Sequence, residues 1–151
     1  MSFLRVKKIK GHDYAYLVQN RWTSKGPRQE VKKYLGRVHY LKGRGHQTLR
    51  FSGGKKEFLV GLVEYELDRI RGGLKKEKVL FDSKKMGFVK GKKKCVLGLN
   101  KGFMCDFTLK RVLNFKKSED IEVDSVKLAK FFIEAGFEVP KEAFIGYFER
   151  L

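Results

Sequence analysis

Cationic and aromatic side chains alternate closely over the first 50 residues of this 151-residue chain. Lys and Arg neutralise phosphates, while exposed aromatic rings can stack on unpaired bases. Acidic partners are scarce, because residues 1–56 contain 15 Lys and Arg against 2 Asp and Glu. The pattern predicts a surface that binds a polyanion, for which nucleic acid is the obvious candidate.

The aromatic residues of this segment have a second interpretation. Tyr14, Tyr16 and Trp22 alternate along an expected strand and could be ordinary core residues of a sheet. We favour burial for most of these rings but not for the cations, which have no acidic neighbours to pair with. The residues that we expect to contact nucleic acid are Lys7, Lys8, Lys10, Arg21, Trp22, Lys25, Arg28, Lys32, Lys33, Arg37, His39, Tyr40, Lys42, Arg44, His46, Arg50, Lys90, Lys92, Lys93 and Lys94.

The positive charge is concentrated at one end of the chain. Residues 57–94 contain 11 Lys and Arg against 6 Asp and Glu, and residues 95–151 contain 9 of each. Solubility needs only a modest net charge, and self-repulsion opposes compaction, so this excess indicates a partner that neutralises it. The near-neutral end is expected to stabilise the fold or to contact a neighbouring protein.

The sequence shows none of the arrangements that catalysis or metal binding usually requires. It has no GxxxxGK[ST] loop and no paired carboxylates, and the glycine-rich runs at 43–45 and 52–54 are more simply turns. The three histidines are scattered, and Cys95 and Cys105 have the spacing of small buried apolar residues rather than of ligands. We expect a protein that is not an enzyme and holds no cofactor and no metal. An enzyme that acts on RNA through a dispersed site is a further alternative.

The uncharged runs are far shorter than the roughly 20 residues of a membrane span, and the N-terminus lacks the apolar region of a signal peptide. A basic amphipathic helix that could lie on an acidic membrane surface is also missing. We expect a cytoplasmic protein without a membrane partner.

The expected fold is α+β. Alternating runs predict an N-terminal antiparallel β meander, which is packed on a central helix at 55–71. Gly36 should stop the third strand, and Gly72 with Gly73 should end the helix. The expected strands are 3–9, 14–22, 28–35, 77–82, 87–89 and 95–99, with a lysine-tipped turn at 90–94, and the expected C-terminal helices are 107–115, 124–135 (with Asp124 as its N-cap) and 140–148. Residues 1–99 would form a basic β-rich lobe, and residues 100–151 a near-neutral helical lobe that is either separate or packed on the first as one domain.

Two resemblances carry functional expectations. Tyr14–Val18, Lys25–Gln29 and Val31–Arg37 together resemble the small N-terminal β segment of insertion-sequence DDE transposases, which is thought to help bind DNA. The rest of the chain has no room for the catalytic domain of those enzymes, so the resemblance implies binding only. Val96–Leu109 and Ala135–Pro140 are similar to small archaeal proteins, and with the size and charge they resemble a basic archaeal ribosomal or ribosome-associated protein.

The leading hypothesis is a non-enzymatic RNA-binding protein that binds ribosomal RNA, as a component or associated factor of the ribosome. Its helical lobe could contact neighbouring ribosomal proteins. The alternative is a duplex-DNA-binding module or regulator of transposon-related origin.

Overall fold

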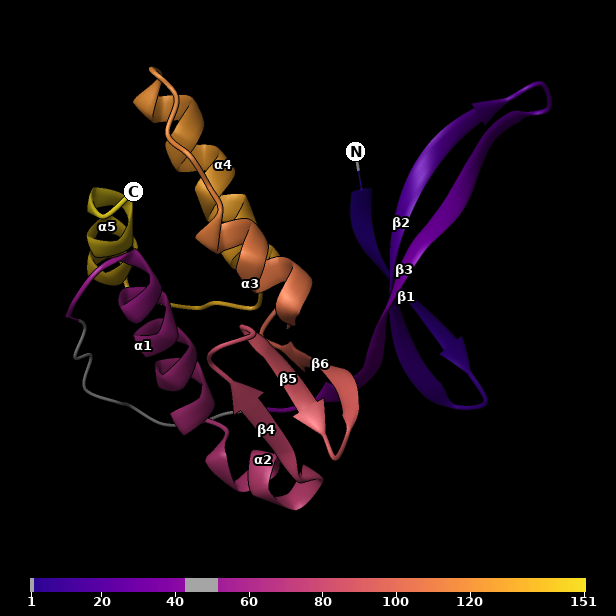
Figure 1. The fold of residues 1–151 in the computed structure, drawn as a ribbon, viewed down its shortest axis with the longest axis horizontal. Coiled ribbons are helices and arrows are strands. Elements are labelled where there is room, and N and C mark those ends of the chain that lie inside the picture. Colours follow the sequence, from indigo (N-terminus) through magenta and orange to yellow (C-terminus); the bar gives the residue numbers. More distant parts are fainter. Residues whose placement is uncertain (1, 43–51) are drawn as a thin grey trace.

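The computed structural model describes residues 2–42 and 52–151, and it confirms the α+β fold class (Figure 1). A mixed sheet begins with the expected N-terminal meander, and helices cover part of it. The elements in chain order are β1 Ser2–Ile9, β2 His12–Thr23, β3 Gly26–Tyr40, α1 Lys55–Asp68, α2 Arg71–Glu77, β4 Val79–Asp82, β5 Gly87–Lys90, β6 Lys93–Leu99, β7 Gly102–Met104, α3 Asp106–Leu113, α4 Ile121–Glu134 and α5 Lys141–Glu149.

The strands are ordered β1-β2-β3-β6-β5-β4 in one sheet, with β7 added to β6. The β3–β6 pair is parallel and aligns Arg37–Tyr40 with Cys95–Gly98, whereas the other pairs are antiparallel. The pairing of β3 with β6 therefore joins the meander to the strands from the later part of the chain.

Gly36 lies at this junction and does not stop the third strand as expected. Strand β3 continues through it to Tyr40. Gly36 has φ 132°, and a Cβ atom on it would lie 2.6 Å from the backbone oxygen of Lys94. The absence of a side chain lets the two backbones approach, so this glycine supports the sheet rather than ending it.

Helix α1 does not cover the meander, contrary to the expectation from its apolar stripe. Its buried residues Phe58, Leu59 and Leu62 belong to the larger of two hydrophobic clusters, together with residues of β4 to β7 and of α3, α4 and α5. The smaller cluster joins the meander to β6 and to Phe107 of α3. Helix α1 therefore shares its core with β4 to β7, whereas the buried meander residues of the smaller cluster lie apart from it.

The larger cluster also decides how the two expected lobes are related. The cluster contains Leu59 and Leu97 from residues 1–99, and it also contains Leu109, Leu128 and Tyr147 from residues 100–151. The hydroxyl of Tyr147 in α5 donates a hydrogen bond to the backbone oxygen of Val112 in α3 (2.8 Å). The two stretches therefore share one core.

Two helix ends differ from the expectation. Gly72 and Gly73 lie inside α2, where a Cβ on Gly73 would be 3.1 Å from Leu41 Cδ2, so a small residue is needed for packing rather than for termination. Helix α4 begins one turn early, with Asp120 as the N-cap that accepts hydrogen bonds from two backbone amides. Asp124 is buried and accepts instead from the amide and hydroxyl of Ser118 (2.7 and 2.8 Å).

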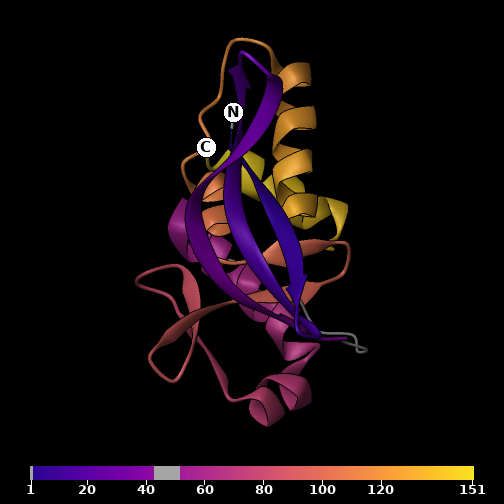
Figure 2. The same cartoon turned by 90° about the vertical axis from the view of Figure 1, so that its right-hand side faces the viewer.

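The meander stands away from the helices in Figure 1, and its three strands cross in front of the helical part in Figure 2. Cys95 and Cys105 are free thiols, and both are buried as expected. No helix of the described residues is long and apolar enough to span a membrane.

Candidate nucleic-acid interface

Three tyrosines form an exposed cluster on one face of the meander. The ring centroids of Tyr16 and Tyr34 are 5.3 Å apart, those of Tyr14 and Tyr34 are 6.4 Å apart, and Lys7 Nζ lies 5.4 Å from the Tyr16 centroid. Ala15, between the two β2 tyrosines, points to the opposite face and enters the smaller hydrophobic cluster. The alternation was thus predicted correctly, but it turns the tyrosines towards solvent.

Burial of most N-terminal aromatic rings, which the sequence favoured, is wrong. Tyr14 and Tyr16 are half-buried, while Tyr34 is 51% exposed and Trp22 is 82% exposed. The meander has its own small core on the face that meets Val96, Phe103 and Phe107, whereas the β5–β6 turn borders the tyrosine face. The rings therefore remain available for a ligand.

A pocket of about 620 Å³ opens between the tyrosine cluster and the β5–β6 turn, and we call it the tyrosine pocket. The parallel β3–β6 pairing brings the two parts together, although they are more than 50 residues apart in the chain. No acidic residue lines the pocket. Its lining residues are Tyr14, Tyr34, Leu35, Arg37, His39, Lys90, Lys93, Lys94 and Cys95.

The cations of the tyrosine pocket are only weakly neutralised by the protein. Lys94 Nζ lies 3.1 Å from an Asp106 oxygen and Lys90 Nζ lies 3.5 Å from a Glu77 oxygen, whereas Lys93 forms no ion pair within the described chain. The Lys90–Glu77 pair is solvent-exposed, and such pairs contribute little to stability, whereas the Asp106 carboxylate that pairs with Lys94 is only 12% exposed. The pocket consequently offers positive charge to a phosphate.

His39 lies in the wall of this pocket, but its ring is not an exposed stacking surface. The side chain is 8% exposed, and Nδ1 lies 3.5 Å from a carboxylate oxygen of Glu77. Burial, followed by the charge of Lys90, lowers the pKa of His39 below its usual 6.5. The imidazole is therefore neutral at neutral pH and links the sheet to the end of α2.

The far end of the β2–β3 hairpin carries a second basic and aromatic group, which we call the hairpin tip: Arg21, Trp22, Lys25 and Arg28. Arg21 and Arg28 are directly opposite each other across the two strands. Like charges in this position destabilise a hairpin, so their pairing favours an anion between them. No ion pair with an acidic side chain compensates these cations in the part of the chain that the structure describes.

The other expected contact residues are spread over the surface. Lys8 lies in β1 opposite Asp13, and Lys10 lies in the β1–β2 turn. Lys92 lies in the β5–β6 turn, and Lys32 pairs with Glu30 (3.2 Å). Lys33 faces a different pocket, described below. Arg44, His46 and Arg50 are outside the described residues.

Tyr40 is held by the protein itself. Its hydroxyl donates a hydrogen bond to Asp13 (2.6 Å), and desolvation together with this carboxylate raises the pKa of Tyr40 to about 12. A Cβ on Gly98 would lie 2.5 Å from the Tyr40 ring, so the ring covers this glycine closely. Tyr40 is thus partly committed to structure, although it is exposed on its outer side.

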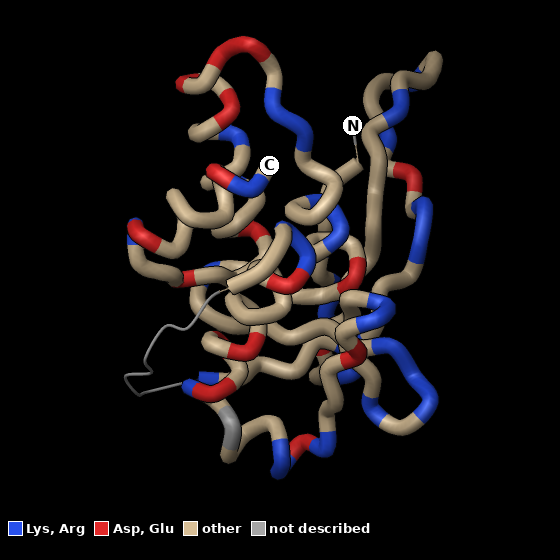
Figure 3. Tube along the Cα trace, turned by 60° about the vertical axis from the view of Figure 1, so that its left-hand side comes forward, with Lys and Arg blue, Asp and Glu red and all other residues tan. Residues whose placement is uncertain are grey.

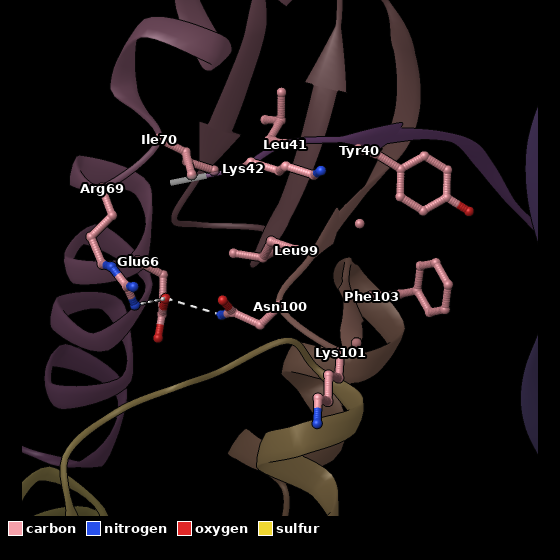
Figure 4. Close-up of a pocket in the computed structure, with 12 residues that line it drawn as sticks. Tyr40, Leu41, Lys42, Glu66, Arg69, Ile70, Leu99, Asn100, Lys101 and Phe103 are labelled. Atoms are coloured by element: carbon pink, nitrogen blue, oxygen red, sulfur yellow. Dashed lines mark hydrogen bonds and ion pairs between the residues drawn. The ribbon is translucent and has the colours of Figure 1, made fainter. Parts of the chain in front are cut away.

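Tyr40 and Lys42 also line a pocket of about 520 Å³ that contains the buried carboxylate of Glu66 (Figure 4). Glu66 is 1% exposed, and its oxygens accept hydrogen bonds from the Glu138 amide (2.7 Å) and from Asn100 Nδ2 (3.3 Å). An Arg69 nitrogen lies 3.5 Å away. Burial raises the pKa of Glu66 despite these partners. The carboxylate joins α1 to the segment after α4, and the exposed carboxylate of Glu138 shares the Arg69 guanidinium with it (3.9 Å).

A groove of about 640 Å³ lies between the meander and helices α3 and α4, and the sequence did not indicate it. Lys33 of β3 lines it together with Lys110, Lys116 and Lys127 from the near-neutral end of the chain. A smaller pocket connects the regions, since it shares Lys94 with the tyrosine pocket and Lys110 with the groove. We call these three pockets together the basic track, because lysines predominate in their lining although Asp82 and Asp106 also belong to it.

Figure 3 shows the same distribution over the whole molecule: Lys and Arg follow one another along the strands and their turns, while Asp and Glu are interspersed mainly among the helices. Sequence reasoning missed Tyr14 and Tyr34 as site residues, and it missed Lys110 and Lys116. The alternation of Tyr14 with Tyr16 was a usable signal for the first pair, whereas the two lysines are placed only by tertiary packing.

Comparisons with protein families, with curated proteins and with solved structures found no match for this chain.

Proposed function

We propose that this protein is a non-enzymatic RNA-binding protein, and that its RNA is ribosomal. The observation that carries the proposal is the tyrosine pocket, where four cations and two accessible rings line one hollow without an acidic residue. Phosphates would lie against the cations and unpaired bases against the rings. The protein would then act in the cytoplasm as a component or associated factor of the ribosome.

The absence of catalysis is part of the proposal. The described carboxylates that are buried, Glu66 and Asp124, are both hydrogen-bonded within the fold. Cys95 is a poor nucleophile, because burial raises the pKa of its thiol to about 11. A labelled RNA incubated with the purified protein should remain intact; turnover that a Glu66→Gln variant abolishes would contradict this part.

The first test measures RNA affinity against salt concentration. Lys90→Gln combined with Lys93→Gln should weaken binding and reduce the slope of log K against log salt, by about 0.7 for each single-strand phosphate contact that is lost. Lys130→Gln combined with Lys141→Gln removes the same charge from exposed positions on α4 and α5 and serves as the matched control. Equal losses in the two double variants would show that only net charge matters and would contradict the site.

The ribosomal target needs a separate test. The tagged protein, crosslinked in its native cell, should recover ribosomal RNA from one discrete site and cosediment with a ribosomal subunit above moderate salt. Scattered RNA that modest salt releases would contradict a ribosomal role. Recovery of ribosomal proteins that contact α4 or α5 would identify the neighbours of the helical part.

A duplex-DNA-binding module is the second candidate, and the hairpin tip is the observation that favours it. A two-stranded β-ribbon fits the major groove of B-DNA, and Arg is the side chain that most often reads guanine there. The resemblance of residues 14–37 to transposase segments points the same way. Duplex DNA that competes with structured RNA of equal length at equal salt would favour this candidate, while preference for RNA would remove it.

A further inference from the structure

The tyrosine pocket combines features that a phosphate alone does not require. Its volume of about 620 Å³ lies within the range of roughly 300–1,000 Å³ that is typical of small-ligand sites. The rings of Tyr14 and Tyr34 contribute its accessible apolar surface, whereas Leu35 and Cys95 are almost fully buried in its wall. Cations surround this apolar part on the side of the β5–β6 turn. Such a pocket suits a ligand with both a flat apolar part and a negative part.

Tyr34 has the position and the support of a stacking platform. Its ring is 51% exposed and is packed against Tyr16 (5.3 Å, 46° between the ring planes) and Tyr14 (6.4 Å, 42°). These neighbours restrict the ring in the absence of a ligand, which lowers the entropy cost of binding. The three rings come from two adjacent strands, so the sheet fixes their spacing.

The shape of the pocket selects unpaired bases. Within a duplex, each base is stacked between its neighbours and cannot lie flat on a protein ring. The pocket is bounded by the sheet on one side and by Lys90, Lys93 and Lys94 of the β5–β6 hairpin on another. A single strand can place a base on Tyr34 while its phosphates reach these lysines or Arg37.

We propose that the tyrosine pocket accepts one unpaired nucleotide of a single strand, with the base stacked on Tyr34 and the flanking phosphates bound by Arg37, Lys90 and Lys93. This inference rests on the proposed RNA-binding function and adds the number of nucleotides in the pocket and the residues that hold the base and the phosphates. It assigns the remaining basic track and the hairpin tip to contacts with phosphates outside the pocket.

The test compares Tyr34→Leu with Tyr34→Phe, which retains the ring. The probe is a short single-stranded oligoadenylate with 2-aminopurine at one position, together with the same probe annealed to its complement. Loss of one stacked base should lower single-strand affinity about 5- to 150-fold in Tyr34→Leu, while Tyr34→Phe binds like the wild type and duplex affinity stays within about twofold in both. At saturating protein, the wild type should quench 2-aminopurine fluorescence and Tyr34→Leu should not.

These measurements distinguish failure of the pocket inference from failure of the proposed RNA binding. If the wild type binds single strand and duplex equally, or if Tyr34→Leu retains full affinity and quenching, the pocket inference is overturned and RNA binding stands. If the Lys90 and Lys93 double variant also behaves like its charge-matched control, the proposed function fails as well. Equal loss of duplex and single-strand binding in Tyr34→Leu would indicate a damaged sheet rather than a lost platform and would overturn the assignment; thermal unfolding of the variant would check this.

Discussion

Trp22 is the most exposed large aromatic side chain among the described residues, at 82% exposure, and it lies opposite Pro27, next to the cross-strand pair of Arg21 and Arg28. A large apolar surface in water has little structural use at the end of a two-stranded ribbon. Arg21 and Arg28 could bind the phosphates of a nucleic-acid strand, and Trp22 could stack on one of its bases.

For Trp22→Ala we expect a loss of RNA affinity with unchanged stability. One stacked base is worth about 1–3 kcal/mol of binding free energy, and the Trp22 side chain contributes little buried area to the fold. Fluorescence anisotropy with labelled RNA and thermal unfolding would measure the two effects. A lower melting temperature, or an unchanged affinity, would refute the role of the hairpin tip.

His39 is the residue whose protonation should affect stability near neutral pH. The groups facing it are Glu77, Lys90 and Arg37, and burial with the Lys90 charge dominates, so its pKa is lowered in the folded state. The folded protein therefore binds this proton less readily than the unfolded chain, and the free energy of unfolding should fall as the pH is lowered through about 6.5.

The measurement is urea unfolding of the wild type and of His39→Gln between pH 8 and pH 5. Other titrating groups are common to both proteins, so the difference in unfolding free energy isolates His39. This difference should shift against the wild type as the pH falls. A constant difference across the range would mean that His39 titrates alike in the folded and unfolded chain.

At the scale of elements, Gly36 and Gly72 offer a matched pair of glycines. Gly36 combines φ 132° with a Cβ position 2.6 Å from the Lys94 oxygen, whereas a Cβ on Gly72 in α2 would meet no atom within 4 Å. Gly36→Ala should destabilise the fold by roughly 2–4 kcal/mol through backbone strain and overpacking. Gly72→Ala should stabilise it by about 0.5–1 kcal/mol through helix propensity.

Chemical unfolding of both variants checks this pair. If Gly36→Ala unfolds like the wild type, the β3–β6 junction is not the close approach described above. Because the tyrosine pocket is built across this junction, Gly36→Ala should also weaken RNA binding, while Gly72→Ala should leave it unchanged.

At the scale of the whole molecule, the basic track extends the interface beyond the segment that the sequence singled out. Lys110 and Lys116 belong to the near-neutral end, yet they line the same groove as Lys33. Arg111 in that groove has a structural role, because it pairs with Glu134 (2.9 Å) and lies over the rings of Phe107 and Phe131.

We expect Lys110→Gln combined with Lys116→Gln to weaken RNA binding and to reduce its salt dependence by about as much as the Lys90 and Lys93 pair does. The same Lys130 and Lys141 double variant is the control. Affinity titrations at several salt concentrations would decide the question, and an unchanged slope would confine the interface to the meander and the β5–β6 turn.

The local elements and the positive sign of the surface could be predicted from the sequence. The alternation of residues 14–18 predicted a strand with Tyr14 and Tyr16 on one face, and Lys90–Lys94 predicted a charged turn, because both depend on neighbours in the chain. The start of α4 was predicted one turn late, because Asp120 and Asp124 are both suitable N-cap residues. The apolar residues of its first turn, Ile121 and Val123, are exposed and do not belong to the buried stripe that marks the helix.

Which of these residues lie together depends on contacts between distant parts of the chain. The parallel pairing of β3 with β6 places Lys90 and Lys93 beside Tyr34 and Arg37, and such a long-range register leaves no local signal. Packing of α3 on one face of the meander also decided that the opposite face carries the exposed tyrosines. A chain pattern states which side chains share a face, but whether that face meets a core or a ligand depends on what the rest of the molecule covers.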